Sequence, residues 1–269
     1  MAVAAALIAN ACPTAGWADP LLQLASPDDA VHFQILQDAG HLIYTATFHN
    51  QPVIERSALV MTIDNVKLTD DVELVQSKPY EVNDTYPYRG VHSQAVNHCR
   101  GATLSLRHQP SNTPFTLEAR AYNDGIAFRF IVPTDKQDAR VPDEDSVFML
   151  PGGCTVWHHA LEGHYEATYQ KHDVDELTSG EWLAPPVTCQ LPGGAGYAVV
   201  TEAALSNYPG MALQADGHRG LHVVLGHSIP FPIPTSCAIT KRISRGCKPR
   251  PPCVETLPRR GGPSSSATI

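Results

Sequence analysis

The sequence predicts an all-β protein: a large antiparallel β-sandwich, or super-sandwich, with a disordered basic C-terminal tail. From Val31 onward, apolar and polar residues alternate with a period of two, which is the pattern of half-buried strands. Asn, Asp, Gly and Pro separate the alternating runs, and no long amphipathic helical pattern occurs between them. Short strands that each carry one apolar face can bury those faces in two antiparallel sheets packed together.

The first two predicted strands show this alternation most clearly. Phe33 and Ile35 alternate with polar neighbours in the first strand, and every second residue from 42 to 48 is apolar in the second. Asp38-Ala39-Gly40 lies between them. Because glycine tolerates positive φ and aspartate can satisfy local backbone donors, this tripeptide predicts a hairpin turn.

Later runs of the same character predict further strands. They are Ala58–Ile63, Val72–Val75, Ala102–Leu106, Phe115–Ala121, Ile126–Val132, Val147–Leu150, Tyr197–Val200 and Leu221–Leu225. Asn123-Asp124-Gly125 separates two of these runs and is a strong hairpin signal. The number of short strands disfavours a parallel α/β fold.

The charge distribution argues against binding to nucleic acid or to anionic membranes. The chain of 269 residues has 19 basic and 27 acidic residues, but seven of the basic residues lie between Lys241 and Arg260. Without those seven and Glu255, the first 240 positions hold 12 basic and 26 acidic residues, a net charge of -14. A segment with this net negative charge repels polyanionic partners.

The two ends of the chain differ in composition from the body, residues 19–236, which we expect to form the sandwich domain. Residues 1–18 resemble the remnant of a signal peptide, because an apolar run too short to span a bilayer precedes the small-residue site Gly16-Trp17-Ala18. We therefore expect a periplasmic or secreted protein. Proline, basic residues and cysteine accumulate in residues 237–269, which predicts either a disordered tail or out-of-frame translation.

Cysteine and histidine give no strong metal signature. The body contains three isolated cysteines, Cys99, Cys154 and Cys189. We expect buried free thiols, with one disulfide as the alternative in an oxidising compartment. His158, His159 and His164 lie close together in the sequence, but adjacent residues on a strand point to opposite faces. A joint transition-metal site of these three histidines is therefore disfavoured.

Three segments together resemble the N-terminal domain of glycoside hydrolase family 97. They are Tyr122–Phe130, Gly180–Thr188 and Thr201–Met211, and the similarity runs from about Leu24 to shortly after His227. In this family the domain is a large β-sandwich that precedes a catalytic (β/α)8 barrel, and no barrel sequence follows here. The resemblance implies a non-catalytic, carbohydrate-associated domain of an α-glucosidase or α-galactosidase, in a truncated gene product that is inactive alone. The alternative is a stand-alone periplasmic carbohydrate-binding module.

Glu202, just after the apolar run Tyr197–Val200, is the candidate metal ligand. In the resembled family the N-terminal domain contributes one glutamate to a calcium ion at the active-site mouth, and Glu202 is the matching position. Calcium takes about six to eight oxygen ligands, so this domain without the barrel would bind the ion weakly. The alternative is an ordinary exposed glutamate at a strand end.

Tyr165, Glu166 and Trp157 are the candidate substrate-binding residues. Aromatic rings stack on the apolar faces of sugars, and a carboxylate accepts hydroxyl hydrogens. Tyr169 and Trp182 lie in the same or flanking segments, and packing between the sheets is the alternative role for any of these aromatic residues. Glycosidic bonds are usually broken by two carboxylates, which this family takes from the barrel, so we expect no catalytic residue in this chain.

Overall fold

The computed structural model describes residues 20–133, 140–161, 167–203, 205, 208–226 and 267–268. It confirms the all-β prediction: these residues form strands and two single-turn 3-10 helices, η1 (Val174–Glu176) and η2 (Pro192–Gly194). No helix in this part of the chain is long and apolar enough to cross a membrane.

The strands fall into two groups along the chain. The first group is β1 (Leu22–Ala25), β2 (Val31–Asp38), β3 (His41–Phe48), β4 (Gln51–Ala58), β5 (Met61–Ile63), β6 (Val66–Lys67), β7 (Val72–Pro87), β8 (Gln94–His108), β9 (Thr113–Tyr122) and β10 (Gly125–Ile131). The second group is β11 (Pro142–Glu144), β12 (Val147–Met149), β13 (Thr155–Ala160), β14 (Gln170–Asp173), β15 (Trp182–Gln190), β16 (Tyr197–Glu202), β17 (Met211–Ala215), β18 (Gly220–Leu225) and β19 (Ala267–Thr268).

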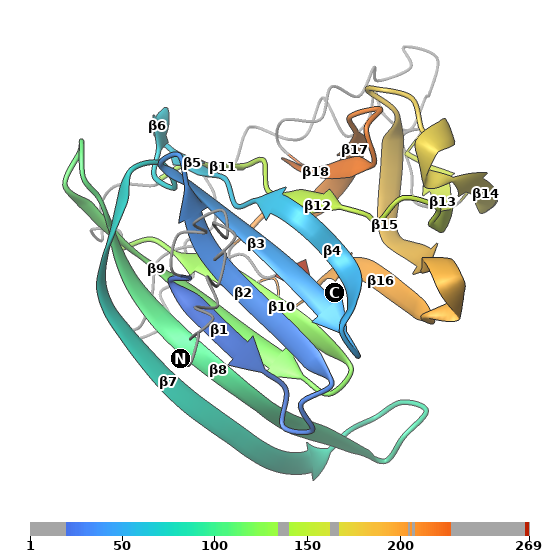
Figure 1. Ribbon diagram of the computed structural model, residues 1–269, viewed down its shortest axis with the longest axis horizontal. Coiled ribbons are helices and arrows are strands. Elements are labelled where there is room, and N and C mark those ends of the chain that lie inside the picture. The colour runs from blue at the N-terminus through green and yellow to red at the C-terminus, as the bar shows by residue number, and fades with distance from the viewer. Residues whose placement is uncertain are drawn as a thin grey trace, which may run out of the picture.

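The strands pair in three antiparallel sheets. A four-stranded sheet has the order β1-β2-β3-β4, and a three-stranded sheet has the order β11-β5-β6. The third sheet has twelve strands, with a main path β12-β18-β17-β15-β16-β19-β10-β9-β8-β7, and β13 and β14 attached beside β15. Figure 1 shows the blue four-stranded sheet lying across the green strands β8 to β10, with the yellow and orange strands β13 to β18 to one side.

Tyr44 marks the centre of the core between the layers. Its fully buried ring contacts Phe33 on the neighbouring strand and reaches across to Phe128 of β10 and Phe148 of β12, with centroid separations of 5.8, 5.4 and 6.5 Å. Its hydroxyl donates a hydrogen bond of 2.8 Å to the carbonyl oxygen of Val147. One side chain thus links the four-stranded sheet to two strands of the large sheet, and the predicted sandwich core is confirmed.

Both predicted hairpin turns are present. Strand β2 ends at Asp38 and β3 begins at His41, and Ala39 and Gly40 between them have φ values of 48° and 88°. The second turn joins β9 to β10, with Tyr122 directly opposite Gly125. Positive φ at both central residues of the first turn matches the twist of the flanking strands.

The hairpin of β7 and β8 is much longer than the predicted runs Val72–Val75 and Ala102–Leu106. The two strands pair from Val72–His108 to Pro87–Gln94, with one register shift between Leu74 and Gln76. From Val75 onward the side chains of β7 are mostly exposed, whichever face of the strand they lie on. Alternation of apolar and polar residues arises only where a strand has one buried face. The exposed part of this hairpin therefore has no such alternation, and its sequence did not predict a strand.

Strand β19 pairs with both β10 and β16, so Ala267 and Thr268 belong to the large sheet. At these two residues the structure departs from the predicted disordered tail, because their backbone groups pair with two strands that would otherwise have unpaired edges there. The rest of the predicted tail and the predicted signal-peptide remnant lie outside the described residues. Cys99, Cys154 and Cys189 are free and buried, as expected.

Candidate functional site

Glu202 is the last residue of β16, at the strand end where the sequence placed it. One oxygen of its carboxylate, Oε2, accepts a hydrogen bond of 2.7 Å from the backbone N–H of Met211, the first residue of β17. The side chain is half-buried, and this burial raises the pKa of the carboxyl above its usual range, although the Met211 N–H opposes the shift. Desolvation is therefore the larger effect on this group.

Tyr208 lies shortly before β17. Its hydroxyl donates a hydrogen bond of 2.9 Å to Oε2 of Glu144, which is buried at the end of β11. Sequence reasoning missed this link, because the two residues are 64 positions apart. Tyr208 is thus tied to a strand of a different sheet.

The geometry at Glu202 suits one ligand of a hard cation. A carboxylate desolvated by burial favours a nearby positive charge, and the N–H of Met211 orients the group through only one of its two oxygens. The residue can therefore supply one oxygen to a calcium ion, and about five to seven further ligands would have to come from other groups.

Glu118, on the outer face of β9, shows the contrasting case of a fully paired carboxylate. It accepts hydrogen bonds from the Tyr80 hydroxyl at 2.5 Å, from Arg120 at 3.0 Å and from Arg129 at 2.6 Å. Burial alone would raise the pKa of this carboxyl, but the hydroxyl and the two guanidinium groups outweigh burial and hold the pKa below its usual range. Because its partners are all in place, Glu118 acts as a structural anchor.

Trp157 of β13 belongs to an aromatic group on the outer surface. Its ring lies 6.2 Å from that of Tyr197, the first residue of β16, and the ammonium of Lys171 lies 5.5 Å from the Trp157 ring centroid. Tyr197 is 67% exposed, so this face is accessible to a ligand. Tyr165 and Glu166, the other two predicted substrate-binding residues, lie outside the described residues.

The other candidate aromatic and histidine residues have packing partners. Trp182 packs against the small apolar cluster of Leu161, Ala184 and Ala212, and Tyr169 meets the ring of His159 edge-on at 5.1 Å. His158 and His159 are both buried and have different partners, so they do not form a joint site, while His164 lies outside the described residues.

A family model described as glycosyl-hydrolase 97 N-terminal matches residues 24–239. The chain belongs to this family. Membership confirms the resemblance of the three segments around Tyr122, Gly180 and Thr201. It also explains the two-layer architecture, since the match covers all the described strands from β2 to β18.

Two curated relatives of the family 97 domain are α-galactosidases. The retaining α-galactosidase of Bacteroides thetaiotaomicron is 28% identical over 243 residues, which cover 84% of this chain and 35% of that protein. A probable retaining α-galactosidase of Streptomyces bingchenggensis is 29% identical over 92 residues, covering 34% of this chain and 14% of that protein. The chain thus spans about a third or less of the length of the curated relatives it matches.

Solved structures share the fold of this family 97 domain. A glycoside hydrolase family 97 enzyme from Pseudoalteromonas sp. strain K8, in complex with acarbose, superposes with a TM-score of 0.68 at 20% identity, over 76% of this chain and 32% of that one. A β-arabinopyranosidase superposes with a TM-score of 0.67 at 16% identity, over 92% of this chain and 39% of that one. These similarities support the fold alone.

Proposed function

We propose that this domain serves as the non-catalytic N-terminal domain of an α-glycosidase of family 97, acting on α-galactosides or α-glucosides beside a catalytic (β/α)8 barrel. The observation that carries the proposal is the family match over residues 24–239, in a chain that spans 35% of the Bacteroides α-galactosidase. Catalytic carboxylates are assigned to the barrel, and the domain shapes the mouth of the active site.

Exposed apolar side chains on and after β16 support a role at an interface between domains. Tyr197 and Val199 are exposed on the face of β16 opposite to Glu202, because side chains alternate along a strand, and Leu205 is exposed in the connection that follows. Exposed apolar side chains commonly mark a contact with another domain. We place the barrel beside the end of β16 that carries Glu202 and Leu205, and the domain in the periplasm or outside the cell.

The proposed function has a second part: Glu202 is one ligand of a calcium ion shared between the domain and the barrel. Bound calcium would provide a positive charge for this desolvated carboxylate, beside which the described residues place none. The Met211 N–H holds the carboxylate in place for this contact, and Tyr208, shortly before Met211, is hydrogen-bonded to Glu144.

A chimeric enzyme tests this function. Residues 24–226 would replace the matching segment of the Bacteroides α-galactosidase, and hydrolysis of an aryl α-galactoside would be followed across a calcium titration. The account predicts an active chimera in which Glu202→Gln raises the calcium concentration for half-maximal activity roughly tenfold. Glu73→Gln, an exposed glutamate on β7, is the matched control and leaves the titration unchanged. If the chimera is active and Glu202→Gln leaves its calcium concentration for half-maximal activity unchanged, Glu202 is not the calcium ligand.

The aromatic group of Trp157, Tyr197 and Lys171 favours a second candidate, a stand-alone carbohydrate-binding module. A partly buried Trp157 ring beside the exposed Tyr197 ring, tilted at 45° to it, offers aromatic surface for the apolar face of a sugar. Titration of the chain with maltooligosaccharides and galactosides separates the two functions. Saturable binding that Trp157→Ala abolishes supports the binding module. If no binding occurs at millimolar sugar, the binding module is excluded and the accessory domain is the remaining function.

A further inference from the structure

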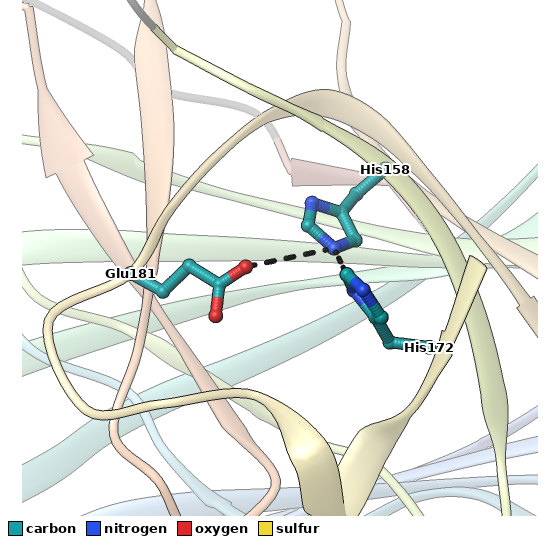
Figure 2. Close-up of side chains that lie close together, drawn as sticks. All are labelled: His158, His172 and Glu181. Carbon is teal, nitrogen blue, oxygen red and sulfur yellow. Dashed lines mark hydrogen bonds and ion pairs between the residues drawn. The ribbon is translucent and has the colours of Figure 1, made fainter. Parts of the chain in front are cut away.

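His158, His172 and Glu181 converge at a second place in the fold, separate from Glu202 (Figure 2). His158 lies on β13, His172 on the edge strand β14, and Glu181 in the turn before β15. The atoms that these side chains can offer to a metal all lie within 4.8 Å of one another. Three side chains from three segments therefore meet around one point.

The strand register brings the two histidines together. In the β13–β14 pair, His158 is opposite Gln170 and His172 is opposite Val156, so the histidines are diagonal neighbours on one face. Nε2 of His158 lies 3.1 Å from Nδ1 of His172. Two nitrogen atoms, each with a lone pair when unprotonated, thus face each other at a short distance.

Glu181 is oriented toward this pair by its neighbour Thr178. Its Oε2 accepts hydrogen bonds from the backbone N–H of Thr178 at 3.1 Å and from the Thr178 hydroxyl at 3.2 Å. These bonds leave the other oxygen, Oε1, at 3.8 Å from Nε2 of His158. An oriented carboxylate with one oxygen directed at a histidine is a common arrangement in metal sites.

The burial of His158 makes its Nε2 the important atom. The side chain is 1% exposed, and Nδ1 has no hydrogen-bond partner among the residues described. The polar interactions of this ring are therefore concentrated at Nε2, which faces both His172 and Glu181. A buried ring with one unsatisfied nitrogen is costly, and a strong interaction at the other nitrogen offsets that cost.

We propose that His158, His172 and Glu181 bind a zinc ion or a similar divalent transition metal. A tetrahedral zinc ion, with bonds of about 2.0–2.2 Å to nitrogen and oxygen, holds its ligand atoms about 3.3 Å apart. The two separations from His158 Nε2, 3.1 and 3.8 Å, lie on either side of that value, and the third, between His172 and Glu181, is within 4.8 Å. Two imidazole ligands suit zinc, nickel or copper and do not suit calcium, which takes oxygen ligands.

Such an ion would join β14 and the turn at Glu181 to β13. Since His172 and Glu181 are only partly buried, water or an external ligand can occupy the fourth position. The competing arrangement is a hydrogen-bonded chain without metal, in which one hydrogen lies between the two imidazole rings.

Zinc titration of the purified full chain distinguishes these arrangements. After treatment with a chelator and dialysis, the protein is titrated with zinc chloride by calorimetry. We expect one ion per chain, and binding at least roughly tenfold weaker in both His172→Gln and Glu181→Gln. The matched control is His222→Gln, since His222 also lies beside carboxylates, at 2.7 Å from Asp145 and 3.8 Å from Asp216. This variant should bind zinc as the wild type does.

A spectroscopic measurement on the unmodified chain covers the case in which a variant does not fold. In nitrogen NMR spectra of the histidine rings, zinc should shift Nε2 of His158 and Nδ1 of His172 while leaving His222 unchanged. The proposal is overturned if the wild type binds no stoichiometric zinc, if both site variants bind as tightly as the wild type, or if zinc leaves the His158 and His172 signals in place.

Discussion

Glu118 and Glu202 should respond to pH in opposite directions, because Glu118 is paired, whereas burial dominates at Glu202 and no counter-charge faces it among the described residues. The perturbation is glutamine at each position, which keeps the shape of the side chain and removes its charge. The comparison tests the physical basis of the proposed cation site, since both glutamates lie in the same domain and differ in their partners.

The cost of Glu118→Gln follows from its hydrogen bonds. Hydrogen bonds to a charged group contribute about 1.5–3 kcal/mol each, but the two arginine partners are 31% and 38% exposed, so solvent screening reduces their bonds to about 1 kcal/mol each. Glutamine keeps one oxygen acceptor. We therefore expect a loss of about 2–3 kcal/mol in the free energy of unfolding near neutral pH.

The signs of the two pH dependences differ. The folded-state pKa of Glu118 lies below the ordinary value of 4.5, so its stabilisation is present above 4.5 and is lost as pH falls through the folded pKa. The folded-state pKa of Glu202 lies above 4.5, so its contribution is fully present below 4.5 and is lost as pH rises through the folded pKa. Near neutral pH, Glu202→Gln should therefore be at least as stable as the wild type.

Urea denaturation followed by tryptophan fluorescence, from about pH 4 to about pH 7, measures both effects. The advantage of the wild type over Glu118→Gln should shrink toward acid, and the advantage of Glu202→Gln over the wild type should grow toward neutral pH. If Glu202→Gln instead destabilised the domain by several kcal/mol near neutral pH, the carboxylate would have a counter-charge already, and the argument for a cation at this position would fail.

Two further substitutions test the fold and its electrostatics. Tyr44→Phe should cost about 1–2 kcal/mol in the free energy of unfolding, because the buried carbonyl of Val147 loses its donor; an unchanged urea midpoint would show that this bond contributes nothing. The hydrogen bond with Asp145 raises the pKa of His222 above 6.5, so the wild type should exceed His222→Gln in stability below about pH 6.5 and lose that advantage as pH rises through the folded pKa. A stability difference independent of pH would contradict this assignment.

The sequence predicted those strands that have one buried face. Phe33, Ile35 and Tyr44 alternate with polar residues, and β2, β3 and the turn between them lie where that alternation places them. By contrast, β15 contains Pro185 and Pro186, which lack the N–H groups that sheets use, so its sequence did not predict a strand.

The candidate sites were predictable to different degrees. Glu202 was found because an apolar strand run ends just before it, although its role as a ligand stays a prediction. The contact of His158 with His172 and Glu181 depends on the diagonal register of β13 and β14 and on the turn held by Thr178. Neither feature leaves a recognisable spacing in the sequence, so only the folded structure reveals the group.

The central claim is that this family 97 domain carries no glycosidase activity of its own. Its most direct test is an assay of the purified chain on aryl α-galactosides and aryl α-glucosides, with calcium present and with a family 97 enzyme as positive control. The account predicts no turnover above the uncatalysed rate, because it assigns the catalytic carboxylates to a barrel outside this domain. Robust turnover that Glu202→Gln abolishes, in a variant that remains folded, would contradict the account and make this domain an enzyme.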